Sequence, residues 1–324
     1  MQVAIVEDIV LEVRKRALAN EIALAAISVS EGKESFDSLL TLIKSHGTIE
    51  VSKSNLLNCF VTDDLEQLYD HHRNKPGLRW RLQTLNEMLG SLRKGDFGFV
   101  FARPESGKTT FLASEVSNFA TQTEQRILWF NNEEDGEKVQ RRIIQATLGL
   151  SLEELYADIP TNRQKYYDLT GGRIKLVDSA NIYRRDVEAL VEEYSPALVV
   201  FDQIDKIKGF TNDREDLRLG SIYQWAREIA KEHCPVIGVC QADATGEGKA
   251  RLTMENIANS KTSKAAEADF ILGIGKRSQE GYEYSRTLTL SKNKLDGDVD
   301  TVPELRHGSR EVTILPEIGR YKDI

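Results

Sequence analysis

The stretch Gly95–Phe111 constrains the fold more than any other part of this 324-residue chain. It opens with an apolar run over residues 97–101, which predicts a buried strand. A polar loop ending in Gly-Lys-Thr follows, and residues 108–116 then have the composition of a helix. Strand, loop and helix in this order predict a phosphate-binding loop, whose backbone N–H groups surround a polyphosphate.

The loop predicts its own ligands, ATP and Mg²⁺. Lys108 can reach the β- and γ-phosphates, and the Thr109 hydroxyl can bind Mg²⁺. A chance Gly-Lys-Thr in a surface turn is the alternative, and the flanking strand and helix disfavour it. The first glycine of the general motif is replaced by alanine. The residues predicted to bind the nucleotide are Ala102, Arg103, Pro104, Glu105, Ser106, Gly107, Lys108, Thr109 and Thr110.

Composition narrows the class of protein. Charged residues make up 29% of the chain and hydrophobic ones 40%, an ordinary balance for a globular protein. No apolar run approaches ~18 residues, so no membrane span is predicted. The first residues lack the basic start of a secretory signal, and we expect an intracellular protein. The three cysteines are too few and too badly spaced for a zinc site or a disulfide framework.

The texture of the chain changes near residue 74, which predicts two regions. Residues 1–74 place apolar side chains at helical spacing, with Ser52 and Thr62 as candidate N-caps, and predict a small helical appendage. A Lys-Pro-Gly turn signal then opens the region 75–324.

Residues 75–324 predict an α/β fold with a mostly parallel sheet covered on both faces, because apolar runs alternate with helical segments. Segment 286–291 alternates apolar and polar residues, and it predicts a strand near the sheet edge. The other predicted strands cover residues 97–101, 126–130, 173–177, 198–202, 234–241 and 270–274.

Three polar residues stand where predicted strands end. Asp202 would hold Mg²⁺ through its water shell, because ligands of open α/β sheets gather at the carboxyl ends of the strands. Glu133 can orient the attacking water and take its proton in ATP hydrolysis, and Glu134 is the rival for this role. Gln241 offers a neutral amide that can sense the γ-phosphate. The plainer alternative for each is a polar strand end or a solvated loop residue.

Two basic loops follow these strands and suit contacts to the phosphates of single-stranded DNA. Phe210 is almost the only aromatic residue in them, so backbone tracking is expected rather than base stacking. Solvated surface loops are the alternative. The net charge of −8 leaves room for such a local track. The predicted DNA-binding residues are Lys206, Lys208 and Arg214 after Asp202, and Lys249, Arg251, Lys261 and Lys264 after Gln241.

Lys292 and Lys294 follow a late strand, and side chains one residue apart on a strand end point the same way. They could reach across a subunit boundary to the γ-phosphate bound by a neighbour, as an arginine finger does. A basic turn is the alternative.

Together these motifs resemble the RecA-like ATPase domain of hexameric replicative DNA helicases of the DnaB type, including their phage relatives. The P-loop alone is shared by many ATPases, whereas its Ala-Arg-Pro opening after a Leu-Gly-x-Leu-x-x-Gly-Asp segment is fairly specific. The likeness covers roughly residues 75–300, and the matching stretches are 85–96, 102–111, 130–133, 199–202, 222–230 and 235–241.

The resemblance implies a role for each motif. Lys108 and Thr109 bind phosphate and Mg²⁺, Glu133 is the catalytic base, Asp202 the metal-site acid and Gln241 the sensor. Lys292 matches the family's trans lysine. Lys294 stands where the arginine finger is usual, and lysine lacks the planar fork that clamps a phosphoryl group. Arg277 or Arg286 are the alternatives for that finger, and Arg277 is also placed among the nucleotide-binding residues.

The resemblance also implies what the protein does. We expect an ATP-dependent replicative helicase that forms a hexameric ring, moves on single-stranded DNA and hydrolyses ATP at subunit interfaces. A primase or helicase loader is the expected partner, in the cytoplasm of a bacterial or phage-infected cell. One rival is a RecA-like DNA-binding ATPase, such as a recombinase or loader, that does not unwind DNA. The other is a protein whose assembly ATP controls without a motor, which the basic loops disfavour.

Overall fold

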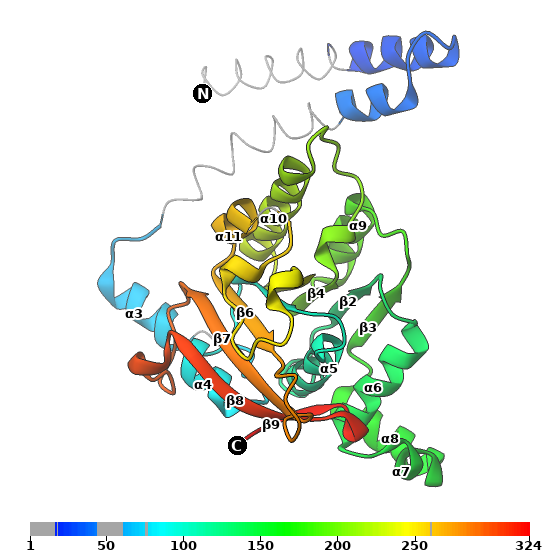
Figure 1. Cartoon of the computed structure of the whole chain (residues 1–324). Coiled ribbons are helices and arrows are strands. Elements are labelled where there is room, and N and C mark those ends of the chain that lie inside the picture. Colours follow the sequence, from blue (N-terminus) through cyan, green and yellow to red (C-terminus); the bar gives the residue numbers. More distant parts are fainter. Residues whose placement is uncertain (1–16, 18, 44–60, 75–76, 260) are drawn as a thin grey trace. The chain divides into compact units, whose positions relative to one another are not determined.

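The computed structural model describes residues 17, 19–43, 61–74, 77–259 and 261–324 (Figure 1). The chain divides into two compact units, Met1–Asn74 and Lys75–Ile324. The first contains helices over 19–30 and 36–43 and helix α3, Leu65–Asn74. Asp64 rather than Thr62 caps α3, since its Oδ1 accepts from the backbone N–H of Glu66 at 2.9 Å. The other cap candidate, Ser52, lies outside the described residues.

Within the described residues of the second unit, nine strands form one sheet in the order β3-β2-β4-β5-β1-β6-β7-β8-β9. The pairs from β3 to β6 are parallel, and those from β6 to β9 are antiparallel. This confirms the predicted α/β class and mostly parallel sheet. The strands are β1 Phe97–Ala102, β2 Ile127–Asn131, β3 Ile174–Asp178, β4 Leu198–Asp202, β5 Val236–Gln241, β6 Phe270–Gly275, β7 Ser285–Asn293, β8 Gly308–Leu315 and β9 Arg320–Asp323.

Helices cover both faces of the sheet (Figure 1). Alternate residues of β1 show the division, because Phe99 packs with α10 in one apolar cluster and Val100 packs with α5 in the other. The first cluster also receives α9, and the second receives α4 and α6. The helices are α4 Gln83–Leu89, α5 Lys108–Phe119, α6 Gly136–Leu148, α7 Leu152–Ala157, α8 Ile159–Thr170, α9 Arg184–Tyr194, α10 Glu215–Glu232 and α11 Lys261–Glu267.

Strand β7 is not near the sheet edge, and that prediction is wrong. Two further strands lie outside it, because residues 308–323 turn back at Pro316–Ile318 and form the hairpin β8–β9. Tyr321 of β9 is 2% exposed and packs edge-on against Phe111 of α5, with ring centroids 5.6 Å apart. The hairpin therefore covers the start of the helix that follows the P-loop.

A buried carboxylate fastens α5 to the segment that precedes α4. Glu115 is fully buried and accepts from the backbone N–H groups of Arg81 at 2.6 Å and Leu82 at 3.4 Å. Burial raises the pKa of Glu115 to about 7, although these hydrogen bonds and the Arg81 charge oppose the rise. Among the residues that the structure describes, no helix combines the length and the hydropathy that a bilayer span requires.

Candidate functional site

The P-loop takes the shape that a phosphate site needs. Gly107 caps α5 in the left-handed region with φ 96°. A Cβ at this position would lie 2.6 Å from Ile314 Cδ1 and 2.7 Å from the Tyr321 hydroxyl, so only glycine fits. The free N–H groups of the first helical turn and the positive end of the helix dipole thus face the loop, an arrangement that favours anions.

A cavity of about 550 Å³ opens beside this helix start and has the size of a small-molecule site. Lys108 lies in its wall, is 7% exposed, and donates to the backbone carbonyls of Ala102 at 3.4 Å and Arg103 at 3.3 Å. Burial lowers the pKa of Lys108, opposed by the charges of two nearby carboxylates. The cavity is lined by Pro104, Glu105, Gly107, Lys108, Thr109, Thr110, Glu133, Glu134, Arg142, Arg286, Ile314 and Pro316.

Asp202 and Thr109 meet at the base of this site. The Thr109 hydroxyl donates to Asp202 Oδ2 at 3.3 Å, and the other oxygen of Asp202 is buried without a hydrogen-bond partner. Burial first, and then the charge of Glu133, raises the pKa of Asp202 to about 7. An unsatisfied carboxylate oxygen beside a hydroxyl fits Mg²⁺, which binds through one or two protein oxygens together with phosphates and water. In the described residues no three His, Cys, Asp or Glu side chains form a separate metal cluster.

Glu133 is held by two amides. Gln241 Nε2 donates to Glu133 Oε1 at 3.1 Å, and Gln203 Nε2 donates to Glu133 Oε2 at 2.5 Å. The rival, Glu134, is instead bound by both terminal nitrogens of Arg142 at 2.7 and 3.0 Å. This hydrogen bonding lowers the pKa of Glu134. Sequence reasoning missed Gln203, whose only signal is its place directly after Asp202.

Arg286 and Tyr321 brace the P-loop from the antiparallel strands, and sequence reasoning missed this role. Arg286 is 5% exposed and donates to the Ser106 carbonyl at 2.8 Å, while the Tyr321 hydroxyl donates to the Gly107 carbonyl at 3.2 Å. The expectation that Arg286 could serve as a finger for a neighbour is wrong, because it is buried against its own loop.

Arg277 lies in an adjoining cavity of about 540 Å³ that shares Pro104 and Glu105 with the Lys108 cavity. It pairs with Glu311 and lies over the ring of Tyr282, 4.6 Å from its centroid. Arg277 is therefore beside the P-loop of its own chain, and the structure does not bring it into the cavity that holds Lys108.

The lysine pair lies at the other edge of the sheet. Lys292 pairs with Ile271 near the start of β6, whereas the P-loop leaves the sheet where Ala102 pairs with Ile274 near the end of that strand. Lys292 Nζ donates to the carbonyls of Ala265 and Ala266 at the end of α11, and Lys294 is exposed. Both lysines therefore point away from the phosphate site of their own chain.

The two basic loops, defined as residues 206–214 and 243–251, are partly as predicted. Lys206, Lys208, Arg214, Lys249 and Arg251 are exposed. Lys208 donates to Asn181, and Arg214 pairs with Asp216 at 2.7 Å. Phe210 packs edge-on against Trp225, with centroids 5.5 Å apart, which agrees with the expectation of little base stacking.

Lys264 does not extend the basic patch, and the structure corrects that expectation. Its side chain is fully buried, where Nζ donates to Asp205 Oδ2 at 2.6 Å and to the Ala258 carbonyl at 2.9 Å. A buried and paired ammonium cannot contact a DNA phosphate directly. The side chain of Lys261, the other predicted member, lies outside the described residues.

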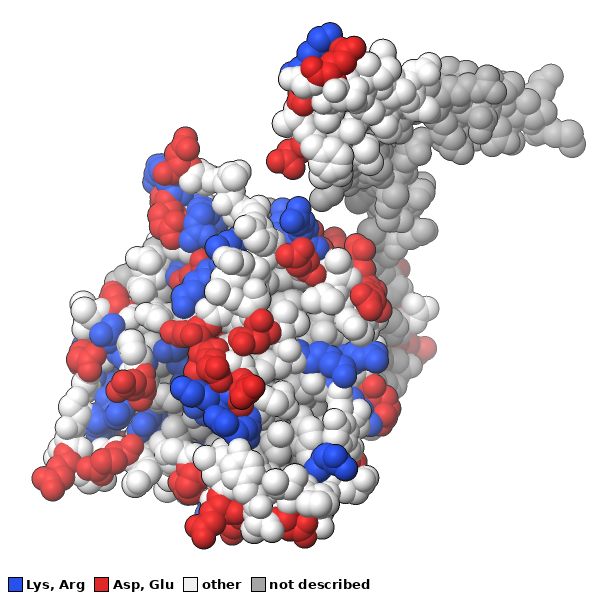
Figure 2. Space-filling model, turned by 90° about the vertical axis from the view of Figure 1, so that its right-hand side faces the viewer, with Lys and Arg blue, Asp and Glu red and all other residues white. Residues whose placement is uncertain are grey.

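The P-loop is linked directly to the second basic loop. Arg103 Nε donates to Glu247 at 2.8 Å, and Arg103 Nη1 donates to the Ala242 carbonyl at 3.0 Å. On the face shown in Figure 2, positive and negative side chains are interspersed, with no continuous surface of one sign. Contacts to a polyanion would therefore be local to loops rather than spread over such a face.

Residues 77–306 match the sequence family described as DnaB-like helicase C terminal domain. The chain belongs to this family. It is 24% identical over 192 residues to the replicative DNA helicase DnaC of Bacillus subtilis, covering 55% of this chain and 42% of the relative. It is likewise 24% identical over 217 residues to the replicative DNA helicase DnaB of Geobacillus stearothermophilus, covering 63% and 47%. The chain thus spans less than half the length of these relatives.

Solved structures agree with a DnaB-like fold. The ATPase domain of a DnaB-like phage helicase superposes with a TM-score of 0.65 at 16% identity, covering 86% of this chain and 99% of that one. A DnaB-like replicative helicase, described with its interactions with primase, superposes with a TM-score of 0.68 at 16% identity, covering 96% and 76%. At this identity the likeness shows the fold alone.

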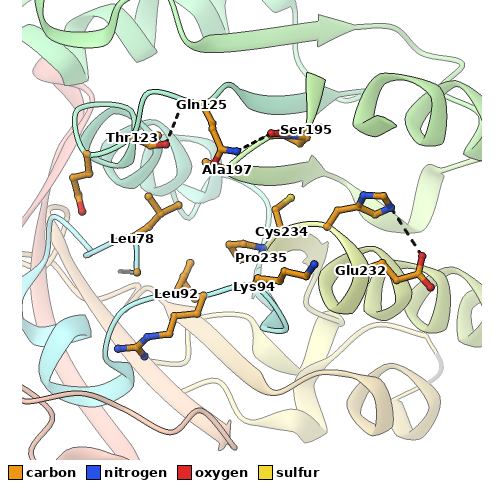
Figure 3. Close-up of a pocket in the computed structure, with 15 residues that line it drawn as sticks. Leu78, Leu92, Lys94, Thr123, Gln125, Ser195, Ala197, Glu232, Cys234 and Pro235 are labelled. Atoms are coloured by element: carbon orange, nitrogen blue, oxygen red, sulfur yellow. Dashed lines mark hydrogen bonds and ion pairs between the residues drawn. The ribbon is translucent and has the colours of Figure 1, made fainter. Parts of the chain in front are cut away.

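Two features of this DnaB-like chain lie apart from the motifs of the match. The hairpin β8–β9 begins after residue 306, where the family match ends, yet it supplies Ile314 and Tyr321 to the P-loop. A cavity of about 440 Å³ lies at the amino-terminal edge of the sheet, where Lys94, Gln125, Ala197 and Pro235 precede strands (Figure 3). None of the predicted site residues lines that cavity.

Proposed function

We propose that this chain is the motor part of an ATP-dependent replicative DNA helicase that assembles as a ring and moves on single-stranded DNA. One observation carries the proposal: Lys108, Thr109, Asp202 and Glu133 converge at one cavity, while the lysine pair of the same chain lies at the opposite edge of the sheet. The phosphate site is thus complete except for a cation that a second copy can supply.

The residues of the cavity support a division of labour in ATP hydrolysis. The Lys108 ammonium and the N–H groups of the helix start would hold the β- and γ-phosphates, and Thr109 and Asp202 would hold Mg²⁺. When bound, Mg²⁺ neutralises the charge that develops on the phosphate oxygens. Glu133 orients a water molecule toward the γ-phosphorus and accepts its proton as the bond to the β-phosphate oxygen breaks, giving ADP and phosphate.

Glu133 is favoured over Glu134 as the base. The Arg142 guanidinium occupies Glu134 in a bidentate pair and lowers its pKa, which weakens it as a proton acceptor. Glu133 receives only neutral amides. Glu134 is then a structural partner that fixes Arg142 in the cavity wall.

Assembly follows from where the cations lie. Lys292 and Lys294 would approach the γ-phosphate held by a neighbouring copy, with six copies completing a ring. A primase or a helicase loader is proposed as the partner, since one similar structure is a DnaB-like helicase described with its interactions with primase. The exposed residues Lys206, Lys249 and Arg251 are proposed to track the DNA backbone.

A second candidate is a DNA-binding ATPase that does not unwind duplexes, such as a recombinase or a loader. The lysine at position 294 favours it, because an ammonium stabilises the transition state less well than the fork of a guanidinium. Slow turnover would suit a protein that binds and releases DNA rather than one that runs along it.

The test is ATP hydrolysis with and without single-stranded DNA, together with the mass in solution and unwinding of a tailed duplex. Lys108→Ala should abolish hydrolysis, and Glu133→Gln should retain nucleotide binding and lose turnover. DNA-stimulated hydrolysis, a ring-sized mass and unwinding would support the helicase. Stimulation without unwinding would favour the second candidate, and a monomer that ignores DNA would contradict both.

A further inference from the structure

Gln203 is a buried residue with an uncommon backbone conformation. Its φ is 72°, in the left-handed region that residues other than glycine rarely adopt, and it is 3% exposed. Its backbone carbonyl accepts from Asn132 Nδ2 at 3.2 Å. Such strain costs of the order of 1–3 kcal/mol and persists where the surroundings hold it, often beside functional groups.

The register of the sheet explains where the side chain of Gln203 goes. Strands β2 and β4 are neighbours, and Asn131 pairs with Asp202 where both strands end. Glu133 lies two residues beyond the first strand end, and Gln203 lies one residue beyond the second. The turn at Gln203 sends the chain into the short 3₁₀ helix Ile204–Lys206, while its amide bonds Glu133.

The two amides on Glu133 differ in how firmly they are fixed. Gln203 is buried and its bond to Oε2 measures 2.5 Å, whereas Gln241 is half-buried and its bond to Oε1 measures 3.1 Å. Gln241 lies on β5, the strand beyond β4, and its residue is followed by the second basic loop. One oxygen of Glu133 is therefore fixed from inside the protein, and the other is bound by a group that can move with that loop.

We propose that Gln203 is a positioning residue for the reaction at this site. Its amide fixes one oxygen of Glu133 and so aims the other oxygen at the water that attacks the γ-phosphate. This inference rests on the proposed function, since it assigns Gln203 to the same hydrolysis. Gln203 does not touch the nucleotide, and it acts only through Glu133.

The decisive variant is Gln203→Gly. Glycine adopts a φ of 72° without strain, so the fold is kept while the amide is removed. We expect kcat to fall roughly 10- to 100-fold, because small misplacements of a catalytic group cost this much. The KM for ATP and the affinity for a fluorescent ATP analogue should stay within about twofold, and the fold-loss should be equal with and without single-stranded DNA, since the Gln203 bond does not depend on the basic loop.

Gln145→Leu is the matched control. Gln145 is also buried and donates to the Glu317 carbonyl at 2.7 Å, but it does not line the Lys108 cavity. Its loss should lower the urea midpoint of unfolding and leave kcat unchanged. The opposite pattern is expected for Gln203→Gly, with a lowered kcat and an unchanged midpoint.

Failure of this inference is separable from failure of the proposed function. An active wild type with Lys108-dependent hydrolysis and an equally active Gln203→Gly variant would refute the positioning role alone. A raised KM with unchanged kcat would refute it too, since it would place Gln203 in nucleotide binding. A wild type without Lys108-dependent hydrolysis would refute the proposed function, and the positioning role would fall with it.

Discussion

Lys264→Met is the substitution that best separates a structural from a DNA-binding role for this lysine. The substitution removes an ammonium that is fully buried and has two acceptors, Asp205 Oδ2 at 2.6 Å and the Ala258 carbonyl at 2.9 Å. It also removes a cation that lies 5.5 Å from the ring centroid of Tyr223. These contacts fasten the turn after β4 to the segment before α11, beneath both basic loops.

The magnitude follows from the charge that is left behind. Removing one partner of a buried ion pair costs about 3–5 kcal/mol, because the other charge stays uncompensated. The Asp205 side chain is 20% exposed and keeps the Tyr223 hydroxyl at 3.0 Å. We therefore expect the lower end, a loss of about 3 kcal/mol in the free energy of unfolding. Changing Asp205 to Asn in the same chain should recover part of this loss.

Urea unfolding followed by tryptophan fluorescence measures the effect. Trp80, Trp129 and Trp225 all lie in the second unit and are 2%, 0% and 3% exposed, so the signal reports on that unit. The control Lys249→Met changes an exposed lysine and should shift stability by less than about 0.5 kcal/mol while weakening binding to a single-stranded oligonucleotide. Wild-type stability of Lys264→Met, combined with weakened DNA binding, would refute the structural role and restore the direct contact.

Three further outcomes follow from the structure. Lys294→Arg should raise kcat severalfold in the assembled protein only, because a guanidinium clamps a phosphoryl group with two donors, and an unchanged rate would remove Lys294 from the site. Glu115→Gln should flatten the pH dependence of urea unfolding: with its pKa raised to about 7, Glu115 contributes stability that is full below its unfolded pKa and lost as pH rises through about 7. Tyr321→Phe keeps the ring contact with Phe111 but deletes the bond to the Gly107 carbonyl, and one hydrogen bond of about 1 kcal/mol predicts a KM for ATP raised about fivefold.

Much of the fold could be predicted because its strands are buried on both faces and read as apolar runs. The ends of those strands also indicated the site, since parallel strands bring their carboxyl ends to one edge. Asp202, Glu133 and Gln241 lie two or fewer residues past such ends, and the structure places them within one hydrogen-bonded cluster with Thr109.

What could not be predicted depends on partners distant in the sequence. Lys264 looks like any loop lysine until the fold brings it to Asp205, 59 residues away. Strand β8 has a mixed pattern of exposure, and its value to the P-loop appears only when Tyr321 reaches Gly107, 214 residues away. Gln203 was missed because propensity gives no reason to expect a left-handed glutamine.

The separation of the P-loop and the lysine pair has a consequence for mixtures of variants. A chain with Lys108→Ala would lack its own phosphate site but still present Lys292 and Lys294 at the opposite edge of its sheet. A chain with Lys294→Ala would have the reverse defect. Under the proposed function, co-assembly should place some intact phosphate sites against intact lysine pairs, so two inactive proteins would complement each other when mixed.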